Sequence, residues 1–236
     1  MIQNYIAVDT ETTGLNPKTD KLIEIGALKV VDGVVTERFS ALVNPHRTLT
    51  EKVRELTGIR QEEVETAGEL EPIFQQFLDF AGELPLLGHR ILFDYSFLKQ
   101  VAVNQRLEFE RQGIDTFSIS RKLMPPERKK NLLEACRYFG VTPKLSHRAL
   151  ADAEAAHLLY QKMLLQKTEE NSSMFEAKPL IYKVKREQTA TKRQKQLLQD
   201  LLKYHRIDLP VQIEYLSRNE VSRWTDQIIS QYGRKK

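Results

Sequence analysis

The order of strand-like and helix-like segments is the feature that most constrains the fold of this chain. Three runs of strand character come first, at residues 3–9, 23–31 and 34–42, and Asp32-Gly33 between the last two is typical of a hairpin turn. Short apolar strands then alternate with helical patterns as far as residue 166. This order predicts an α/β fold in which helices flank a mixed five-stranded sheet.

The remaining elements follow from apolar spacing. Short apolar runs at residues 84–88 and 113–116 predict the buried fourth and fifth strands. Apolar residues at helical spacing predict helices at 51–56, 71–80, 93–103, 118–123, 132–139 and 148–166. The polar stretch that begins near residue 168 is expected to be a linker. Two further amphipathic patterns predict a small helical module at residues 191–236.

The charge is divided unevenly along the chain. Residues 174–236 hold 14 Lys and Arg against 7 Asp and Glu, whereas residues 1–173 hold 22 against 25. A basic tail on an acidic body favours contact with a polyanion. The same composition also fits helices whose charged faces are simply solvated.

Several protein classes are disfavoured by composition. The single cysteine, Cys136, cannot form an intramolecular disulfide, and no apolar run approaches the ~18 residues of a membrane span. The first residues lack the pattern of a signal peptide. We therefore expect a cytoplasmic protein that does not associate with a membrane.

Two acids follow the first apolar strand directly. Asp9 and Glu11 are two residues apart, so on a strand both side chains point to the same face. Carboxylates this close repel each other unless a cation lies between them, and oxygen ligands favour Mg²⁺ or Mn²⁺. Taken alone, such a pair more often marks only a strand that ends in a polar turn.

Other candidate residues lie where predicted elements meet. Asp94 lies where an apolar strand leads into a helix, and Asp152 lies near the start of the last helix of the body, five residues after His147. Singly, each acid could cap a helix or interact with its dipole, and the histidine could be structural.

Together, these residues resemble the DnaQ-like DEDDh family of 3′→5′ exonucleases. This family includes the proofreading epsilon subunit of bacterial DNA polymerase III and the exonuclease domain of PolC polymerases. The matching motifs are VDTETTGL at 8–15, GHRILFDYSFL at 88–98 and HRALADAEA at 147–155. The resemblance covers about residues 3–166 and implies a ribonuclease H-like sheet.

The resemblance also implies a catalytic site with two Mg²⁺ or Mn²⁺ ions. Asp9, Glu11 and Asp152 would hold one ion, Asp9 would bridge to the second, and Asp94 would act on that second ion. His147 would be the general base that accepts a proton from the attacking water.

Substrate contacts are implied on the same grounds. The residues implied to contact the 3′-terminal nucleotide are Thr12, Thr13, Gly14, Leu15, His89, Arg90, Phe93 and His147. Members of the family commonly have His-Asn where this chain has His89-Arg90, so Arg90 is expected to contact a phosphate or to alter nucleotide preference. In the tail, the candidates for phosphate contacts are Lys192, Arg193, Lys195, Lys203 and Arg206.

These inferences predict an exonuclease domain at residues 1–167, a linker at 168–190 and a basic helical module at 191–236. The expected substrate is a single-stranded or frayed 3′ end, of DNA rather than RNA, in proofreading, replication or repair. A polymerase or a clamp is a possible partner. The sequence leaves open an RNA-trimming enzyme and a non-catalytic nucleic-acid-binding subunit, although the latter is disfavoured because every expected acid is present.

Overall fold

The computed structural model describes residues 3–142 and 148–234, which divide into two compact units. The first unit comprises the chain up to Pro45 together with Thr50–Val184. The second comprises His46–Leu49 and the chain from Lys185 onward. Among the described residues, none of the helices combines the length and the apolar character needed to cross a membrane.

The first unit is built on a mixed sheet, which in the described part of the chain has six strands. These are β1 (Tyr5–Thr12), β2 (Leu22–Val31), β3 (Val34–Leu42), β4 (Leu86–Gly88), β5 (Gln112–Asp115) and β6 (Lys178–Pro179). Their order is β3-β2-β1-β4-β5-β6. The strands β1, β2 and β3 are antiparallel, whereas β4 pairs in parallel with both β1 and β5. The predicted mixed sheet is confirmed, with β6 as one strand more than expected.

The turn between β2 and β3 has the predicted chemistry. Val31 pairs with Val34, and the two residues between them, Asp32 and Gly33, both have positive φ, at 51° and 79°. A two-residue hairpin loop of this kind requires positive φ at both positions, which Asp-Gly tolerates at little cost. The turn therefore helps to set the register of β3 against β2.

The helices of the first unit are α1 (Glu51–Thr57), α2 (Gln61–Glu65), α3 (Leu70–Ala81), α4 (Leu92–Asn104), α5 (Thr116–Leu123), α6 (Leu132–Tyr138) and α7 (Ala149–Leu164), with a short 3₁₀ helix, η1 (Ser172–Phe175). Several begin at a side-chain cap. The Thr50 hydroxyl accepts the Val53 N–H, and the Asn131 side chain accepts the Glu134 N–H. Gly58, with φ of 68°, ends α1.

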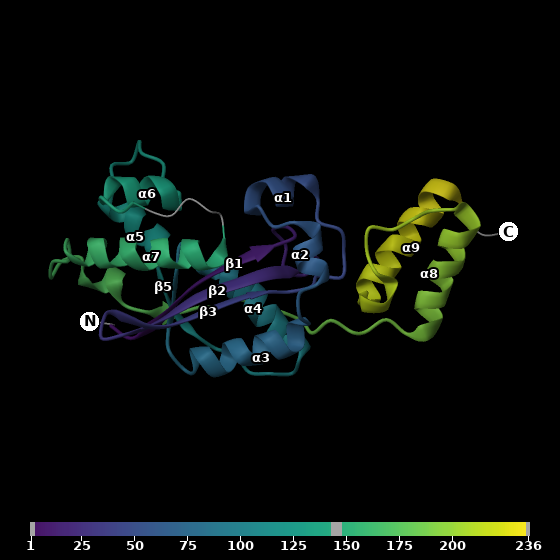
Figure 1. The fold of residues 1–236 in the computed structure, drawn as a ribbon, viewed down its shortest axis with the longest axis horizontal. Helices are drawn as coiled ribbons and strands as arrows, with labels where there is room; N and C mark the ends of the chain where they lie inside the picture. The colour runs from purple at the N-terminus through teal and green to yellow at the C-terminus, as the bar shows by residue number, and fades with distance from the viewer. Residues whose placement is uncertain (1–2, 143–147, 235–236) are drawn as a thin grey trace. The chain divides into compact units, whose positions relative to one another are not determined.

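Helices cover both faces of the sheet (Figure 1), and strand alternation divides the apolar residues between two cores. Ile6 and Val8 pack on the face covered by α3 and α4, with phenylalanines such as Phe74. Tyr5 and Ala7 pack on the opposite face, with residues of α5, α6 and α7. Consequently, successive residues at the end of β1 also point to opposite faces.

The segment expected to be a linker is packed on the first unit for much of its length. The compact unit continues to Val184, and Phe175 of η1 is buried, with its carbonyl accepting the hydroxyl of Tyr160. The segment is also held by the pairing of β6 with β5 and by Leu180 and Tyr182, which pack against the core formed with α3 and α4. Contacts of this kind are not visible in the composition of the segment.

The second unit consists mainly of α8 (Lys192–His205), the 3₁₀ helix η2 (Ile213–Tyr215) and α9 (Arg218–Tyr232). Its core includes Leu198, Leu201, Val221 and Ile228, whereas the neighbouring Leu197 is 52 % exposed. The segment His46–Leu49 joins this unit, and Arg47 forms an ion pair with the buried Glu220 at 2.9 Å.

Candidate active site

Three carboxylates meet at the end of β1. Asp9 and Glu11 point to the face of the sheet that α7 covers, and Asp152 in the first turn of α7 points back toward them. Each of the three offers an oxygen, and these oxygens all lie within 4.8 Å of one another. The expectation that Asp9 and Glu11 share a face is therefore met, and the chain adds a third acid from a distant helix.

Asp94 reaches the same strand end from the other face of the sheet. It lies in the first turn of α4 and is buried, with 3 % of its surface exposed. Its Oδ1 accepts two hydrogen bonds from Thr10, one from the backbone N–H at 2.9 Å and one from the hydroxyl at 2.8 Å. Thr10, between Asp9 and Glu11, thus fixes the fourth acid beside the other three.

A glycine allows α7 to approach the sheet closely. Gly26 on β2 pairs with Asp9, and a Cβ at this position would lie 2.0 Å from the Leu150 nitrogen and 2.3 Å from the Ala149 carbonyl carbon. The backbone of α7 therefore passes over β2 where any side chain would block it. This close approach brings Asp152 to the acids of β1.

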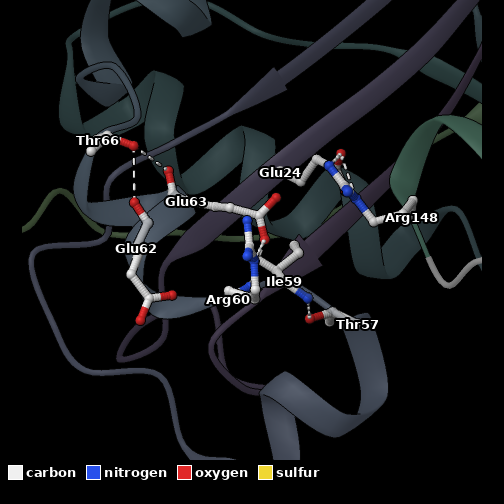
Figure 2. A network of polar contacts seen from close by, with 8 residues as sticks. All are labelled: Glu24, Thr57, Ile59, Arg60, Glu62, Glu63, Thr66 and Arg148. Carbon is white, nitrogen blue, oxygen red and sulfur yellow. Dashed lines mark hydrogen bonds and ion pairs between the residues drawn. The ribbon is translucent and has the colours of Figure 1, made fainter.

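An ion pair between the buried Glu24 and the partly exposed Arg148 fixes the start of α7, as Figure 2 shows. Glu24 on β2 is 1 % exposed and accepts N–H bonds from Arg148 at 2.8 to 3.1 Å and from the Ala149 backbone at 3.1 Å. The carboxylate thereby satisfies an N–H group at the helix N-terminus and interacts favourably with the helix dipole. Because Glu24 pairs with Glu11 across the strands, the same contact ties α7 to the site.

The corner between α1 and α2 lies next to this ion pair (Figure 2). Glu63 accepts hydrogen bonds from the backbone and side chain of Arg60, at 2.9 and 3.1 Å. The hydrogen bonds that Arg148 donates to Glu24 raise the pKa of Arg148, and the charge of Glu63 acts in the same direction with a smaller effect. The Thr57 hydroxyl accepts the Ile59 N–H at 3.1 Å, which closes the turn before α2.

Crowding of the acids alters their titration. Burial raises the pKa of Glu11 to about 8, and the charges of Asp152, Glu24 and Asp94 act in the same direction. Burial and the neighbouring carboxylates also raise the pKa of Asp9 well above its ordinary value. Asp94 has its pKa raised by burial to about 7, against the lowering effect of its Thr10 hydrogen bonds. Such a cluster favours protons or a cation between the carboxylates.

The four acids open into a cavity of about 310 Å³. Its lining comprises Asp9, Thr10, Glu11, Leu56, His89, Arg90, Phe93, Asp94 and Asp152. The turn after β1 lies at the end of this strand, where the Thr12 hydroxyl donates to the Gly14 carbonyl. In the same turn, Thr13 exchanges hydrogen bonds with Lys21. Leu15 follows with 84 % of its surface exposed.

His89 and Arg90 lie side by side in different environments. The His89 Nε2–H donates to the Lys130 carbonyl at 2.7 Å, and Nδ1 lies 3.0 Å from the Thr116 hydroxyl. Burial lowers the pKa of His89. Arg90 is exposed, has a positive φ of 72°, and places its guanidinium 4.3 Å from the centre of the Phe117 ring.

The predicted residues of the tail belong to the second unit. His147, the predicted general base, falls outside the described residues. Lys192 and Arg193 lie in the first turn of α8 and Lys203 in its last, in the second unit. Lys195 donates to the Glu214 carbonyl within that unit, and Arg206 caps α8 with a φ of 56°.

Sequence reasoning missed Thr10, Glu24, Gly26 and Arg148. Glu24 carried a signal, because it is a single acid in an otherwise apolar run, LIEIGALKV, on the same face as Glu11. A buried carboxylate requires a partner. That the partner is Arg148 depends on a contact between residues 124 positions apart, which no local pattern indicates.

Comparison with known proteins agrees with this geometry. A family model described as Exonuclease (RNase_T) matches residues 6–160. The DNA polymerase III PolC-type protein of Bacillus subtilis is 35 % identical over 165 residues, which are 69 % of this chain and 11 % of that protein. The chain thus spans about a tenth of the length of this relative.

Solved structures share the fold at low sequence identity. Escherichia coli exonuclease I in complex with a dT13 oligonucleotide aligns with a TM-score of 0.59 and 16 % identity, over 72 % of this chain and 42 % of that one. The nuclease domain of 3′hExo, a DEDDh family member bound to rAMP, aligns with a TM-score of 0.61 and 18 % identity, over 75 % and 96 %. Because the family model matches residues 6–160, which are more than half of the sequence, the chain belongs to the exonuclease family that this model describes.

Proposed function

We propose that this chain is a metal-dependent 3′→5′ exonuclease that releases nucleoside 5′-monophosphates from the 3′ end of DNA. The observation that carries the proposal is the meeting of Asp9, Glu11 and Asp152 within 4.8 Å, with Asp94 held beside them by Thr10. The mutual repulsion of four acids from β1, α4 and α7 destabilises the fold. Fold stability therefore does not explain why these acids lie together.

The donor set fits divalent cations such as Mg²⁺ or Mn²⁺. All four groups offer carboxylate oxygens, which these ions prefer. Burial, and to a smaller extent the neighbouring carboxylates, raise the pKa of Asp9 and Glu11, and a bound cation would oppose both effects by stabilising the ionised forms. Asp9, Glu11 and Asp152 would hold one ion, and Asp94 together with Asp9 would hold the second. When bound, two such ions help to deprotonate the attacking water and stabilise charge on the leaving oxygen.

The chain's own residues would orient the reactants. His147 would accept the proton of the attacking water, a role that suits an imidazole. The ion pair of Glu24 with Arg148 would keep Asp152 in place, since it fixes the start of α7. The turn at Thr12–Gly14 and the exposed Leu15 would contact the terminal nucleotide, and Phe93 would line its pocket.

Support for DNA as the substrate comes from the sequence relatives, which are DNA polymerases. They also favour a role in replication, proofreading or repair in the cytoplasm, with a polymerase or clamp as partner. RNA trimming is the second candidate, because the structurally similar 3′hExo domain was solved with rAMP, whereas exonuclease I was solved with dT13.

The decisive experiment is hydrolysis of 5′-labelled substrates with Mg²⁺ or Mn²⁺ and with EDTA. Single-stranded DNA, duplex DNA with a mismatched 3′ end, and RNA should be compared. We expect stepwise shortening from the 3′ end that EDTA stops, and its loss in Asp9→Ala and Asp152→Ala. Glu170→Ala, an exposed acid outside the cavity, is the matched control. Full activity in either site variant, or no loss of any substrate, would refute the proposal.

A further inference from the structure

A second cavity adjoins the acidic one. It has a volume of about 600 Å³ and is formed by Arg90 together with residues of α5 and of the segment that leads into α6. Its lining comprises Arg90, Phe117, Arg121, Pro126, Lys129, Lys130 and Asn131. Arg90 also lines the cavity of the four acids, so the two cavities are neighbours that share one side chain.

The charges of the second cavity are all positive. Among the described residues that line it, four are Lys or Arg and none is Asp or Glu. Lys130 has a structural task, since its ammonium donates to the carbonyls of Pro125, Pro126 and Arg128 and thereby shapes the loop. Within the described part of the chain, the side-chain ends of Arg121 and Lys129 form no hydrogen bond or ion pair. These two cations are therefore available to an anion.

Arg90 is held in a costly conformation that directs it into this cavity. Its φ of 72° lies in the left-handed region, which is unfavourable for a residue with a Cβ. Its backbone N–H donates to Asp115 Oδ1 at 2.8 Å, and its guanidinium stacks on Phe117 at 4.3 Å. The stack covers a face of the aromatic ring, so the cavity presents charge rather than a platform for a base.

We propose that this cavity binds backbone phosphates of the substrate strand on the 5′ side of the scissile bond. The inference rests on the proposed function, because a strand whose 3′ end lies among the acids must continue over a neighbouring surface. Arg90 connects the acidic cavity to a basic one, and phosphates are attracted there by Arg121 and Lys129. Such contacts do not depend on base sequence.

The test compares substrates of different length. The variant Arg121→Gln/Lys129→Gln removes the two available cations, and Lys122→Gln/Lys162→Gln removes two exposed cations of the same unit that line neither cavity. We expect the first variant to lose kcat/KM severalfold on DNA of about ten nucleotides and to keep it on a dinucleotide. The slope of log affinity against log salt should fall by about 1.4, or about 0.7 for each lost contact. Arg121→Lys/Lys129→Arg should retain the wild-type slope.

Three outcomes would overturn the inference. Equal loss on long and short substrates, or an unchanged salt slope, would exclude a strand-binding subsite. Weaker binding of dTMP in the first variant would show that the cavity holds a free nucleotide instead. Anisotropy with a labelled oligonucleotide in EDTA separates this test from the proposed function, because binding is then measured without turnover. If the wild-type chain showed no hydrolysis while the Arg121→Gln/Lys129→Gln variant still bound the oligonucleotide more weakly, only the catalytic proposal would be contradicted.

Discussion

The ion pair between Glu24 and Arg148 is the contact whose removal tests the account of the site most sharply. In Glu24→Gln, the side chain keeps its shape but loses its charge. If the amide oxygen accepts from Arg148, the NH₂ group faces the Ala149 N–H, which is also a donor, so one of the two hydrogen bonds is lost. Asp152 lies three residues further along α7. The substitution should therefore lower stability and also loosen the catalytic geometry.

The size of the effect follows from the contacts. Hydrogen bonds to a charged group contribute roughly 1.5–3 kcal/mol each. The Arg148 side chain is 38 % exposed and can hydrogen-bond to water once the ion pair is lost, whereas the Glu24 side chain is 2 % exposed. We therefore expect the free energy of unfolding to fall by about 3 kcal/mol, which corresponds to one or two such bonds. For a domain of this size that corresponds to a fall in Tm of roughly 6–12 °C.

Thermal unfolding in EDTA measures the stability, and steady-state hydrolysis of a 3′-terminal nucleotide at saturating metal measures the activity. We expect kcat to fall about 10- to 100-fold with a smaller change in KM, because Asp152 is misplaced rather than removed. Glu37→Gln removes an exposed partner of Lys29 and is the matched control, with an expected cost below about 1 kcal/mol. A Glu24→Gln protein with wild-type Tm and kcat would refute the reasoning, as would additive effects of Glu24→Gln and Arg148→Gln.

Three further predictions concern the site. In the metal-free protein, the pKa of Glu11 is about 8 in the folded state, against an ordinary value of 4.5 when unfolded, so the folded state binds more protons between these two pH values. The stability contributed by the neutral carboxyl is therefore fully present below about pH 4.5 and is lost as the pH rises through about 8. Unfolding scans in EDTA should give a Tm that falls over this range, and a rising Tm would contradict the prediction. Asp9→Asn should raise the Tm of the metal-free protein by relieving repulsion while abolishing hydrolysis, so a lowered Tm would count against repulsion. Gly26→Ala should destabilise by more than about 3 kcal/mol, since its Cβ meets the backbone of Leu150 at 2.0 Å, and denaturant unfolding would measure the loss; a cost under about 1 kcal/mol would show that α7 can move away.

Much of the first unit could be predicted from local patterns. The Asp32-Gly33 turn, the cap at Thr50 and the apolar periodicity of α3 are set by residues close in sequence, and the structure has each of them. The exceptions depend on distant contacts. Phe175 packs beside α7, and the first unit extends to Val184, although the composition of this segment predicts a polar linker.

The site divides in the same way. Asp9 and Glu11 share a face because side chains alternate along a strand, which the sequence alone determines. The order of the motifs that contain Asp94, His147 and Asp152 also indicated the family from the sequence alone. The meeting of Asp94 and Asp152 with the acids of β1 could not be derived from spacing. Asp94 comes from the opposite face of the sheet and is held by Thr10, and Asp152 reaches the site only because Gly26 leaves room for α7.

What the sequence by itself determined is therefore the chemistry: carboxylates, a histidine and the strand and helices that carry them. Tertiary structure alone decided the pairing of Glu24 with Arg148 and the joining of His46–Leu49 to the second unit. It also placed the basic cavity of Arg121 and Lys129 next to the acids. The physical reason is that a buried charge or a lining side chain is satisfied by whichever residue packing brings near, and packing joins positions that are far apart in the chain.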